Sequence, residues 1–252
     1  HPGEQAEERS EGDMSILVLA DPSKAATQSA VTAAQQLGPE VHVLQVDDAH
    51  MLAENVAPVL AAMAKWPNVP DCYGWLALDR RGQWRMRDEF AQQNGLPGQV
   101  IEHDALKEFI TRNYACDSAG RYFFQNGLQR VFISLITTPW IARIVPNETT
   151  QKIITQCQTE IHPTSAFSDE HGNIYIAGSM KQSICKDLTA QQFETAECPG
   201  IALLHDHDLD QFSELAKLRE EACSFGGSWN WEGRQLALDP IHSEELSKRF
   251  GF

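Results

Sequence analysis

The segment from Asp71 to Trp140 decides the fold, because turn, helix and strand signals follow one another in it with little between them. It reads DCYGWLALDRRGQWRMRDE (71–89), VIEHDALKEFITRNY (100–114) and DSAGRYFFQNGLQRVFISLITTPW (117–140). Residues 73–78 alternate into the turn Asp79-Arg80-Arg81-Gly82, where Asp caps the turn and Gly takes a positive φ. The segment therefore predicts antiparallel hairpins combined with a helix.

The same hairpin signal recurs later in the chain. Asp117-Ser118-Ala119-Gly120 and Asp169-Glu170-His171-Gly172 repeat the D-x-x-G pattern before alternating apolar positions, and Glu232-Gly233 is a shorter version. Ile101-Glu102-His103 and Pro240-Ile241-His242 each lead into a helix-like run. We predict a degenerate duplication, in which two hairpin-plus-helix halves meet near residues 146–165.

The residues before Asp71 follow a different pattern. The runs 15–20 and 41–46 are short and apolar, as in buried strands, and each precedes a helical segment, at 25–37 and 51–65. Strands that alternate with helices are typical of a parallel βαβ unit. The proline-marked stretch 66–70 predicts a linker to the rest of the chain.

The predicted fold class is therefore α+β. We expect a flexible tail at residues 1–13 and a βαβα segment at residues 14–66. Two related antiparallel sheet-plus-helix units should follow, at residues 67–150 and 151–252.

Composition narrows the classes of function. The chain of 252 residues has a formal net charge of −15, so phosphate backbones should repel it, and we expect no nucleic-acid partner. No apolar run approaches the roughly 18 residues of a membrane span, and we expect no membrane partner. The six cysteines form no CxxC pair, and the first residues lack the apolar core of a signal peptide. These features indicate reduced thiols and a cytoplasmic location.

Residues 14–58 resemble the start of the alpha subunit of electron transfer flavoproteins. The matching stretches are MSILVLA (14–20), VTAAQQLG (31–38), VHVL (41–44) and LAENVAP (52–58). The later half of that family, which holds its FAD with glycine- and arginine-bearing motifs, has no counterpart in this chain. We therefore expect no cofactor, and a flavin in particular is not expected despite the resemblance.

Residues 69–252 resemble an uncharacterised proteobacterial family of domains of unknown function. The matching stretches are YGWLALDRRGQWR (73–85), EFITRNYACDSAGRYFFQNGLQRVF (108–132), TPW (138–140), LLHDHDL (203–209) and RFGF (249–252). A fainter similarity connects the chain to a second unassigned bacterial family, which is built from hairpin-plus-helix repeats. The resemblance implies a bacterial cytoplasmic α+β protein and carries no established chemistry.

The basic residues of this acidic chain concentrate at one place. Four arginines lie within eight residues, at Arg80, Arg81, Arg85 and Arg87. Arg85 and Arg87 share one face of a strand, and with Arg112 they could bind an anion through charge-assisted hydrogen bonds. Trp75 and Trp84 would line the same pocket. The alternative interpretation is a solvated sheet face.

The stretch HDHD (205–208) is a candidate metal site. Alternate residues of a strand point to one side, so His205 and His207 could both reach one ion. The alternative interpretation is a polar junction between a strand and a helix, with Asp208 and Gln211 as a capping box.

The sequence contains no G-x-S-x-G elbow, no Walker loop and no G-x-G-x-x-G fingerprint, so it offers little support for an enzyme. We predict a non-catalytic bacterial cytoplasmic protein that senses a small anionic ligand or docks an acidic protein partner. The alternative is a metal-dependent hydrolase centred on His205 and His207.

Overall fold

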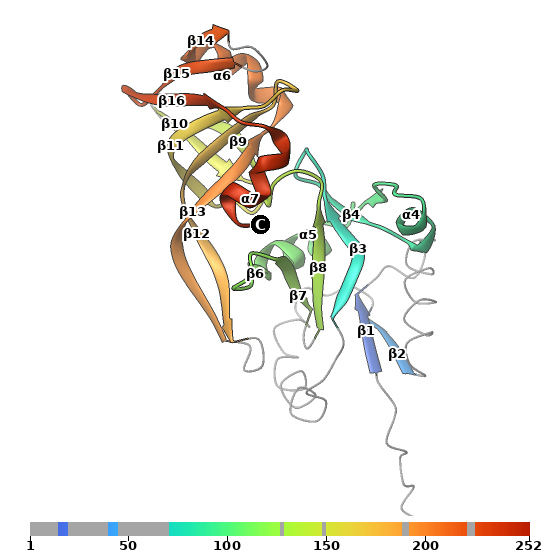
Figure 1. Cartoon of the computed structure of the whole chain (residues 1–252). Coiled ribbons are helices and arrows are strands. Elements are labelled where there is room, and N and C mark those ends of the chain that lie inside the picture. The colour runs from blue at the N-terminus through green and yellow to red at the C-terminus, as the bar shows by residue number, and fades with distance from the viewer. Residues whose placement is uncertain are drawn as a thin grey trace, which may run out of the picture. The chain divides into compact units, whose positions relative to one another are not determined.

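A computed structural model of the chain describes residues 15–19, 40–44, 71–126, 129–147, 150–187, 192–220 and 225–252 (Figure 1). Its contacts divide the chain into two units, residues 1–61 and 62–252. In the first unit, β1 (Ser15–Leu19) and β2 (Glu40–Leu44) pair in parallel, as predicted. The tail, the helices and the linker predicted before Asp71 lie outside the described residues, and so does most of the flavoprotein-like segment.

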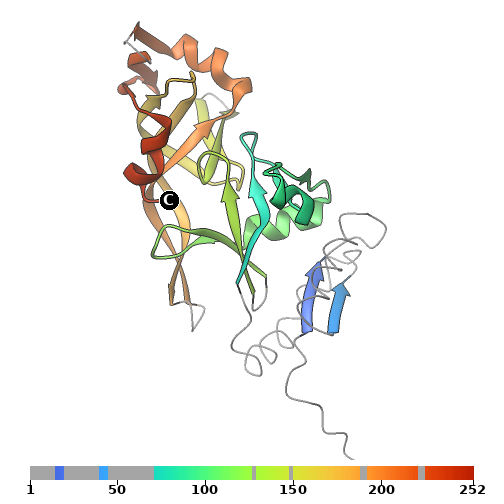
Figure 2. The same cartoon turned by 45° about the vertical axis from the view of Figure 1, so that its right-hand side comes forward.

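The described strands of the second unit all join one mixed sheet (Figures 1 and 2). In chain order they are β3 (Cys72–Leu78), β4 (Trp84–Met86), β5 (Gln99–Val100), β6 (Tyr114–Cys116), β7 (Tyr122–Asn126), β8 (Gln129–Leu135), β9 (Trp140–Asn147), β10 (Thr150–Thr155), β11 (Glu160–Ser168), β12 (Ile174–Asp187), β13 (Gln192–Leu204), β14 (Ala216–Glu220), β15 (Phe225–Trp231) and β16 (Arg234–Pro240). Their order across the sheet is β14-β15-β16-β11-β10-β9-β13-β12-β6-β7-β8-β3-β4-β5.

The described helices are short. They are α4 (Glu89–Gln93), α5 (Asp104–Arg112), α6 (Leu209–Leu215) and α7 (Leu246–Phe250), with the single 3₁₀ turns η1 (Asp206–Asp208) and η2 (Ser243–Glu245). Within the described ranges, no helix is long and apolar enough to cross a lipid bilayer.

The predicted α+β class is wrong, because strands dominate the described residues and the longest described helix, α5, has only nine residues. The two separate sheet-plus-helix units are wrong as well. One sheet runs through both, and the boundary expected after residue 150 falls in the β9–β10 hairpin, where Asn147 pairs with Thr150. The physical reason is visible in β7, where three successive residues, Tyr122 to Phe124, are buried. Both faces of that strand are therefore covered: Phe109 of α5 meets Phe124 edge to face on one, and Phe123 and Phe132 lie together on the other. The short helices thus supplement the burial that neighbouring strands of one sheet provide.

Five consecutive strands close into a ring within this sheet. Neighbours pair antiparallel from β9 through β13, and β13 returns to pair with β9 in parallel, with Ala202 opposite Trp140. The register places ten apolar side chains on one common inner face, and none of them is more than 4% exposed. They are Trp140, Ala142, Ile144, Ile153, Ile161, Ala166, Ile176, Met180, Ala202 and Leu204.

The sheet contains a repeated connectivity, but with bounds other than those predicted. The strands β6-β7-β8-β3-β4 and β11-β12-β13-β9-β10 follow the same order with the same orientations, including one parallel pair in each. The first set spans residues 72–126 and 129–135, and the second spans described residues between 140 and 204. Only the second set closes, since β10 pairs with β11, whereas β5 follows β4 in the first set.

Four hairpin turns share one hydrogen-bond pattern around a buried side-chain oxygen. They begin at Asp79, Asp117, Thr155 and Asp169, none of which is more than 6% exposed. In each turn this oxygen accepts two backbone N–H groups, from the residues two and four positions later, at 2.8–3.2 Å. The residue three positions later has a positive φ, which is 74° at Gly82, 77° at Gly120, 59° at Gln158 and 79° at Gly172.

The three predicted Asp turns are therefore confirmed, and Thr155 adds a turn that the D-x-x-G pattern could not detect. Glu232 and Gly233 form a different turn: both have a positive φ, and the loop contains only these two residues, as in a type I′ hairpin.

The Thr155 turn offers a test of this geometry. An L side chain with a positive φ costs roughly 1–2 kcal/mol, and the exposed side chain of Gln158 has no described hydrogen bond that offsets the cost. We expect Gln158→Gly to raise the free energy of unfolding by about 1 kcal/mol, measured by urea denaturation. Ser118→Gly, in the Asp117 turn at a position without positive φ, should instead lower it. A loss of stability in both variants would contradict the assignment.

Candidate functional site

The predicted arginine and tryptophan residues lie on two different faces of the β3–β4 hairpin. Ala77 is opposite Arg85, and Leu78 is opposite Trp84. Trp84 is therefore on the core side, where it is 3% exposed and its ring meets Tyr114 edge to face. Arg85 lies on the other side of the sheet. The two residues do not face one pocket.

Trp75 does lie on the same face as the predicted arginines. The N–H of Arg87 donates to the carbonyl of Trp75 at 2.8 Å, so the two residues are cross-strand neighbours. The Arg87 guanidinium reaches the carbonyl of Leu96 at 3.1 Å. Arg112 is exposed at the end of α5, on a separate element.

Most arginines near this hairpin are already paired with aspartates. The pairs are Arg81–Asp206, Arg85–Asp79, Arg121–Asp117, Arg130–Asp71 and Arg143–Asp208, with N–O distances between 2.6 and 3.1 Å. Arg80 donates to the side chain of Asn173. These bonds hold turns and strands together. Of the three predicted ligand arginines only Arg85 forms an ion pair within the described residues, whereas Arg87 donates to neutral oxygens of Leu96 and Ser134.

The predicted metal residues form a compact cluster just after β13. They do not alternate on a strand as predicted, because His205 caps the 3₁₀ turn η1 and His207 lies within it. Ligand atoms of His205, Asp206 and His207 all lie within 4.8 Å of one another. His205 is 7% exposed, and its Nδ1 accepts the backbone N–H of His207 at 3.1 Å. Nδ1 also lies 2.8 Å from Oδ1 of Asp206, whose other oxygen binds Arg81. The cluster could hold a metal ion, although a guanidinium already neutralises its carboxylate.

The predicted capping box is wrong. Asp208 precedes α6 but makes no side-chain cap bond there. Its carboxylate instead accepts Nε of Arg143 at 2.6 Å and the backbone N–H of Ile144 at 3.0 Å. The buried Asp208 therefore ties the end of β13 to β9, which is a structural role.

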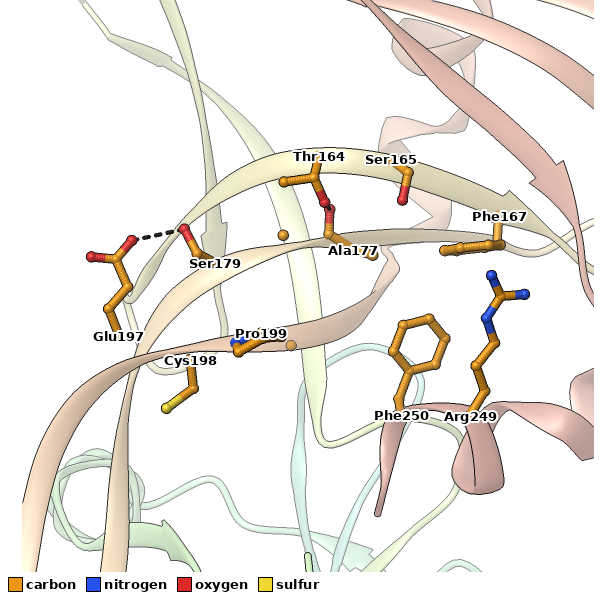
Figure 3. A pocket seen from close by; sticks show the side chains of 12 residues that line it. Thr164, Ser165, Phe167, Ala177, Ser179, Glu197, Cys198, Pro199, Arg249 and Phe250 are labelled. Carbon is orange, nitrogen blue, oxygen red and sulfur yellow. Dashed lines mark hydrogen bonds between the residues drawn. The ribbon is translucent and has the colours of Figure 1, made fainter.

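A hollow of about 350 Å³ lies between α7 and the outer face of β11, β12 and β13, and we call it the α7 hollow (Figure 3). Ser165 and Ala177, which are opposite each other in the register, contribute small side chains to its lining. Ser179 continues this row, and the larger side chains of Phe167 and Phe250 border it. A run of small outward side chains between bulky ones leaves space above the sheet.

The position of α7 follows from its connection to β16. β16 pairs in parallel with the end of β11, so the chain that leaves β16 passes over the outer face of the ring. Glu170, in the β11–β12 turn, accepts the N–H and Oγ–H of Ser243 at 3.0 and 2.5 Å. The side-chain bond from Ser243 lowers the pKa of Glu170 to about 2. α7 then ends at Gly251, which has a φ of 73°.

Arg249 supplies a positive charge to the α7 hollow. Its guanidinium lies 4.5 Å from the centre of the Phe167 ring, and Phe250 meets that ring edge to face at 5.6 Å. Within the described residues Arg249 forms no hydrogen bond and no ion pair. Its donors are therefore free to bind a ligand, while the ring beneath orients the guanidinium.

A second hollow, of about 420 Å³, is lined by residues that include Tyr73, Phe132 and Phe252. It also contains an arginine, Arg121, but Asp117 holds that guanidinium at 2.7 Å. The arginines of the two hollows differ: within the described residues Arg249 has no ion pair, whereas Arg121 is paired with Asp117.

The sequence alone does not single out Arg249, although this residue begins the stretch RFGF (249–252) that carries part of the family resemblance. A single arginine beside an aromatic residue carries no signal by itself. Its importance arises only because β11 and α7 bring Phe167 and Arg249 together across more than 80 positions of the chain.

The second unit thus defines a strand-rich protein with a small, partly polar hollow on the outer face of a closed ring. The chain belongs to the family DUF2944, described as "Protein of unknown function (DUF2946)", whose model matches residues 56–252. No curated protein matches the sequence.

The chain is also similar to two solved structures. One is a DUF1285 family protein from Silicibacter pomeroyi DSS-3, with 16% identity, a TM-score of 0.34, and coverage of 71% of this chain and 87% of that chain. The other is a DUF1285 family protein from Shewanella baltica OS155, with 10% identity, a TM-score of 0.31, and coverage of 56% and 91%.

Protonation of His205 should make stability depend on pH. Burial lowers the pKa of His205 below its ordinary value of 6.5, so the folded state favours the neutral imidazole. The free energy of unfolding that this preference contributes is fully present above pH 6.5. It is lost as the pH falls through the pKa that His205 has in the folded state. We expect the free energy of unfolding to decrease between pH 7 and pH 5, and to decrease less in His205→Asn, which keeps a cap acceptor but cannot titrate.

The measurement is urea denaturation at several pH values. The exposed His242 provides the matched control, because His242→Asn should retain the decrease seen in the unaltered protein. Identical pH profiles for His205→Asn and the unaltered protein would contradict the assignment.

Proposed function

We propose that this is a non-catalytic bacterial cytoplasmic protein that binds a small anionic ligand at the α7 hollow. The observation that carries the proposal is the unpaired Arg249 guanidinium, held over Phe167 at the edge of a hollow of about 350 Å³. That volume is at the lower end of the range typical of small-molecule sites. The ligand is therefore small.

The chemistry of the hollow supports an anion. A guanidinium presents parallel N–H donors that match a carboxylate or phosphate, and such bonds are about twice as strong as neutral ones. The hydroxyl of Ser165 can add a further donor. The remaining lining is largely apolar, so we expect the ligand to carry an aliphatic or aromatic part beside its charge.

Hexanoate is a suitable probe, because it combines a carboxylate with a short apolar chain. We expect it to shift the backbone amide signals of Gly178, Ser179 and Gly200 in two-dimensional NMR titrations of the full chain. Arg249→Gln should weaken its dissociation constant about tenfold or more, since a hydrogen bond to a charged group contributes about 1.5–3 kcal/mol. Added salt should weaken binding as well.

Two variants separate this site from the predicted arginine face. Arg112→Gln removes an exposed arginine on α5 and should leave the affinity unchanged. Arg87→Gln should also have no effect. Loss of binding in Arg87→Gln with normal binding in Arg249→Gln would overturn the assignment in favour of the arginine face.

A metal-dependent hydrolase is the second candidate, and the cluster of His205, Asp206 and His207 is the observation that favours it. A catalytic zinc site commonly uses three protein ligands and leaves one position for water. The cluster supplies three, but Asp206 would have to release Arg81 or share its carboxylate with it.

This candidate requires zinc to bind in a 1:1 ratio, measured by calorimetry on protein treated with chelator. His207→Ala should then weaken zinc binding about tenfold or more, while the exposed His171, outside the cluster, can be replaced by Ala without effect. Equal zinc affinity in both variants would exclude the cluster as the site.

A further inference from the structure

We infer that the ligand of the α7 hollow is zwitterionic, with a carboxylate at one end and an ammonium group at the other. This inference rests on the proposed function and adds a second pole to the site. The pole is Glu197, which lines the same hollow on the side away from Arg249 (Figure 3).

Glu197 is oriented toward the hollow by a hydrogen bond. Oγ of Ser179 donates to Oε1 of Glu197 at 2.7 Å, which draws the carboxylate along the row of small side chains. Lys181 is opposite Glu197 in the β12–β13 register, yet within the described residues no ion pair joins them. Glu197 therefore keeps accepting capacity for a cationic group.

The β11–β12 register gives the separation of the two poles. Arg249 lies over Phe167, which is opposite Tyr175, and Ser179 is four residues further along β12. At about 3.3 Å per residue, the poles are about 13 Å apart. Two hydrogen bonds of about 3 Å leave about 7 Å between the charged groups of the ligand, the span of about two extended residues.

A dipeptide and an ω-amino acid both satisfy these requirements. Each has an ammonium and a carboxylate at its ends, and each is thin enough to lie over the small side chains of Ser165, Ala177 and Ser179. What the two classes share is an ammonium group and a carboxylate separated by about 7 Å. A dicarboxylate would be repelled by Glu197, and a diamine would be repelled by Arg249.

Matched six-carbon probes test the second pole. The NMR titration compares hexanoate, 6-aminohexanoate and hexylammonium, with glycylglycine as the peptide probe. We expect 6-aminohexanoate to bind about tenfold more tightly than hexanoate, and hexylammonium to bind more weakly than both. Tighter binding of glycylglycine than of 6-aminohexanoate would assign the site to peptides, and the reverse order would assign it to ω-amino acids.

Glu197→Gln keeps an acceptor for Ser179 but removes the charge. It should abolish the advantage of 6-aminohexanoate and leave the affinity for hexanoate unchanged. Glu194→Gln, on the same strand but outside the hollow, should retain the advantage.

The outcomes separate this inference from the proposed function. If hexanoate binds through Arg249 but 6-aminohexanoate gains nothing, or keeps its gain in Glu197→Gln, the zwitterion is rejected and the anion site stands. If none of the probes shifts the signals of the hollow, both are rejected.

Discussion

The parallel pairing of β13 with β9 is the contact on which the second unit depends. A ring of five consecutively antiparallel strands can close only through a parallel pair, because the number of strands is odd. Three opposed residue pairs, beginning with Ala202 and Trp140, make this contact, and the N–H of His205 extends it to the carbonyl of Ala142. Closure satisfies two strand edges and encloses the inner row of apolar side chains. The salt bridge from Asp208 to Arg143 fastens the same junction from outside.

Two strands of the ring, β11 and β12, extend beyond its closed part and pair with the other strands of the second unit. β11 pairs with β10 near its start and with β16 near its end, while β12 meets β6 where Ile184 is opposite Cys116. The β16 connection brings α7 over the outer face, and the α7 hollow results from that placement. The C-terminal segment then reaches the first set of strands, since a Cβ on Gly120 would lie only 1.8 Å from the carbonyl oxygen of Gly251.

Local chemistry was predictable where a few adjacent residues determine it. Asp79, Asp117 and Asp169 form the expected turns, because each side chain satisfies N–H groups two and four positions away. The turn at Thr155 was not predicted, because a threonine hydroxyl takes the place of the Asp carboxylate and Gln158 takes the place of the glycine. The fold class was mistaken for a related reason: apolar runs reveal burial, but they do not say whether a helix or another strand provides the cover.

The features of the candidate site likewise divide into those that local sequence determines and those that depend on the tertiary structure. The sequence by itself determined the turns, the approximate strand positions and the shared face of Arg85 and Arg87, since all of these follow from short-range periodicity. His205 and His207 are close because the chain turns in η1 after β13, and not because they alternate on a strand. Only the tertiary structure decided which charges are neutralised, that Trp84 faces the core, and that Arg249 and Glu197 border one hollow. Ion pairs and hollows join residues that are distant in the chain, and their partners are set by strand order and register, which no local pattern encodes.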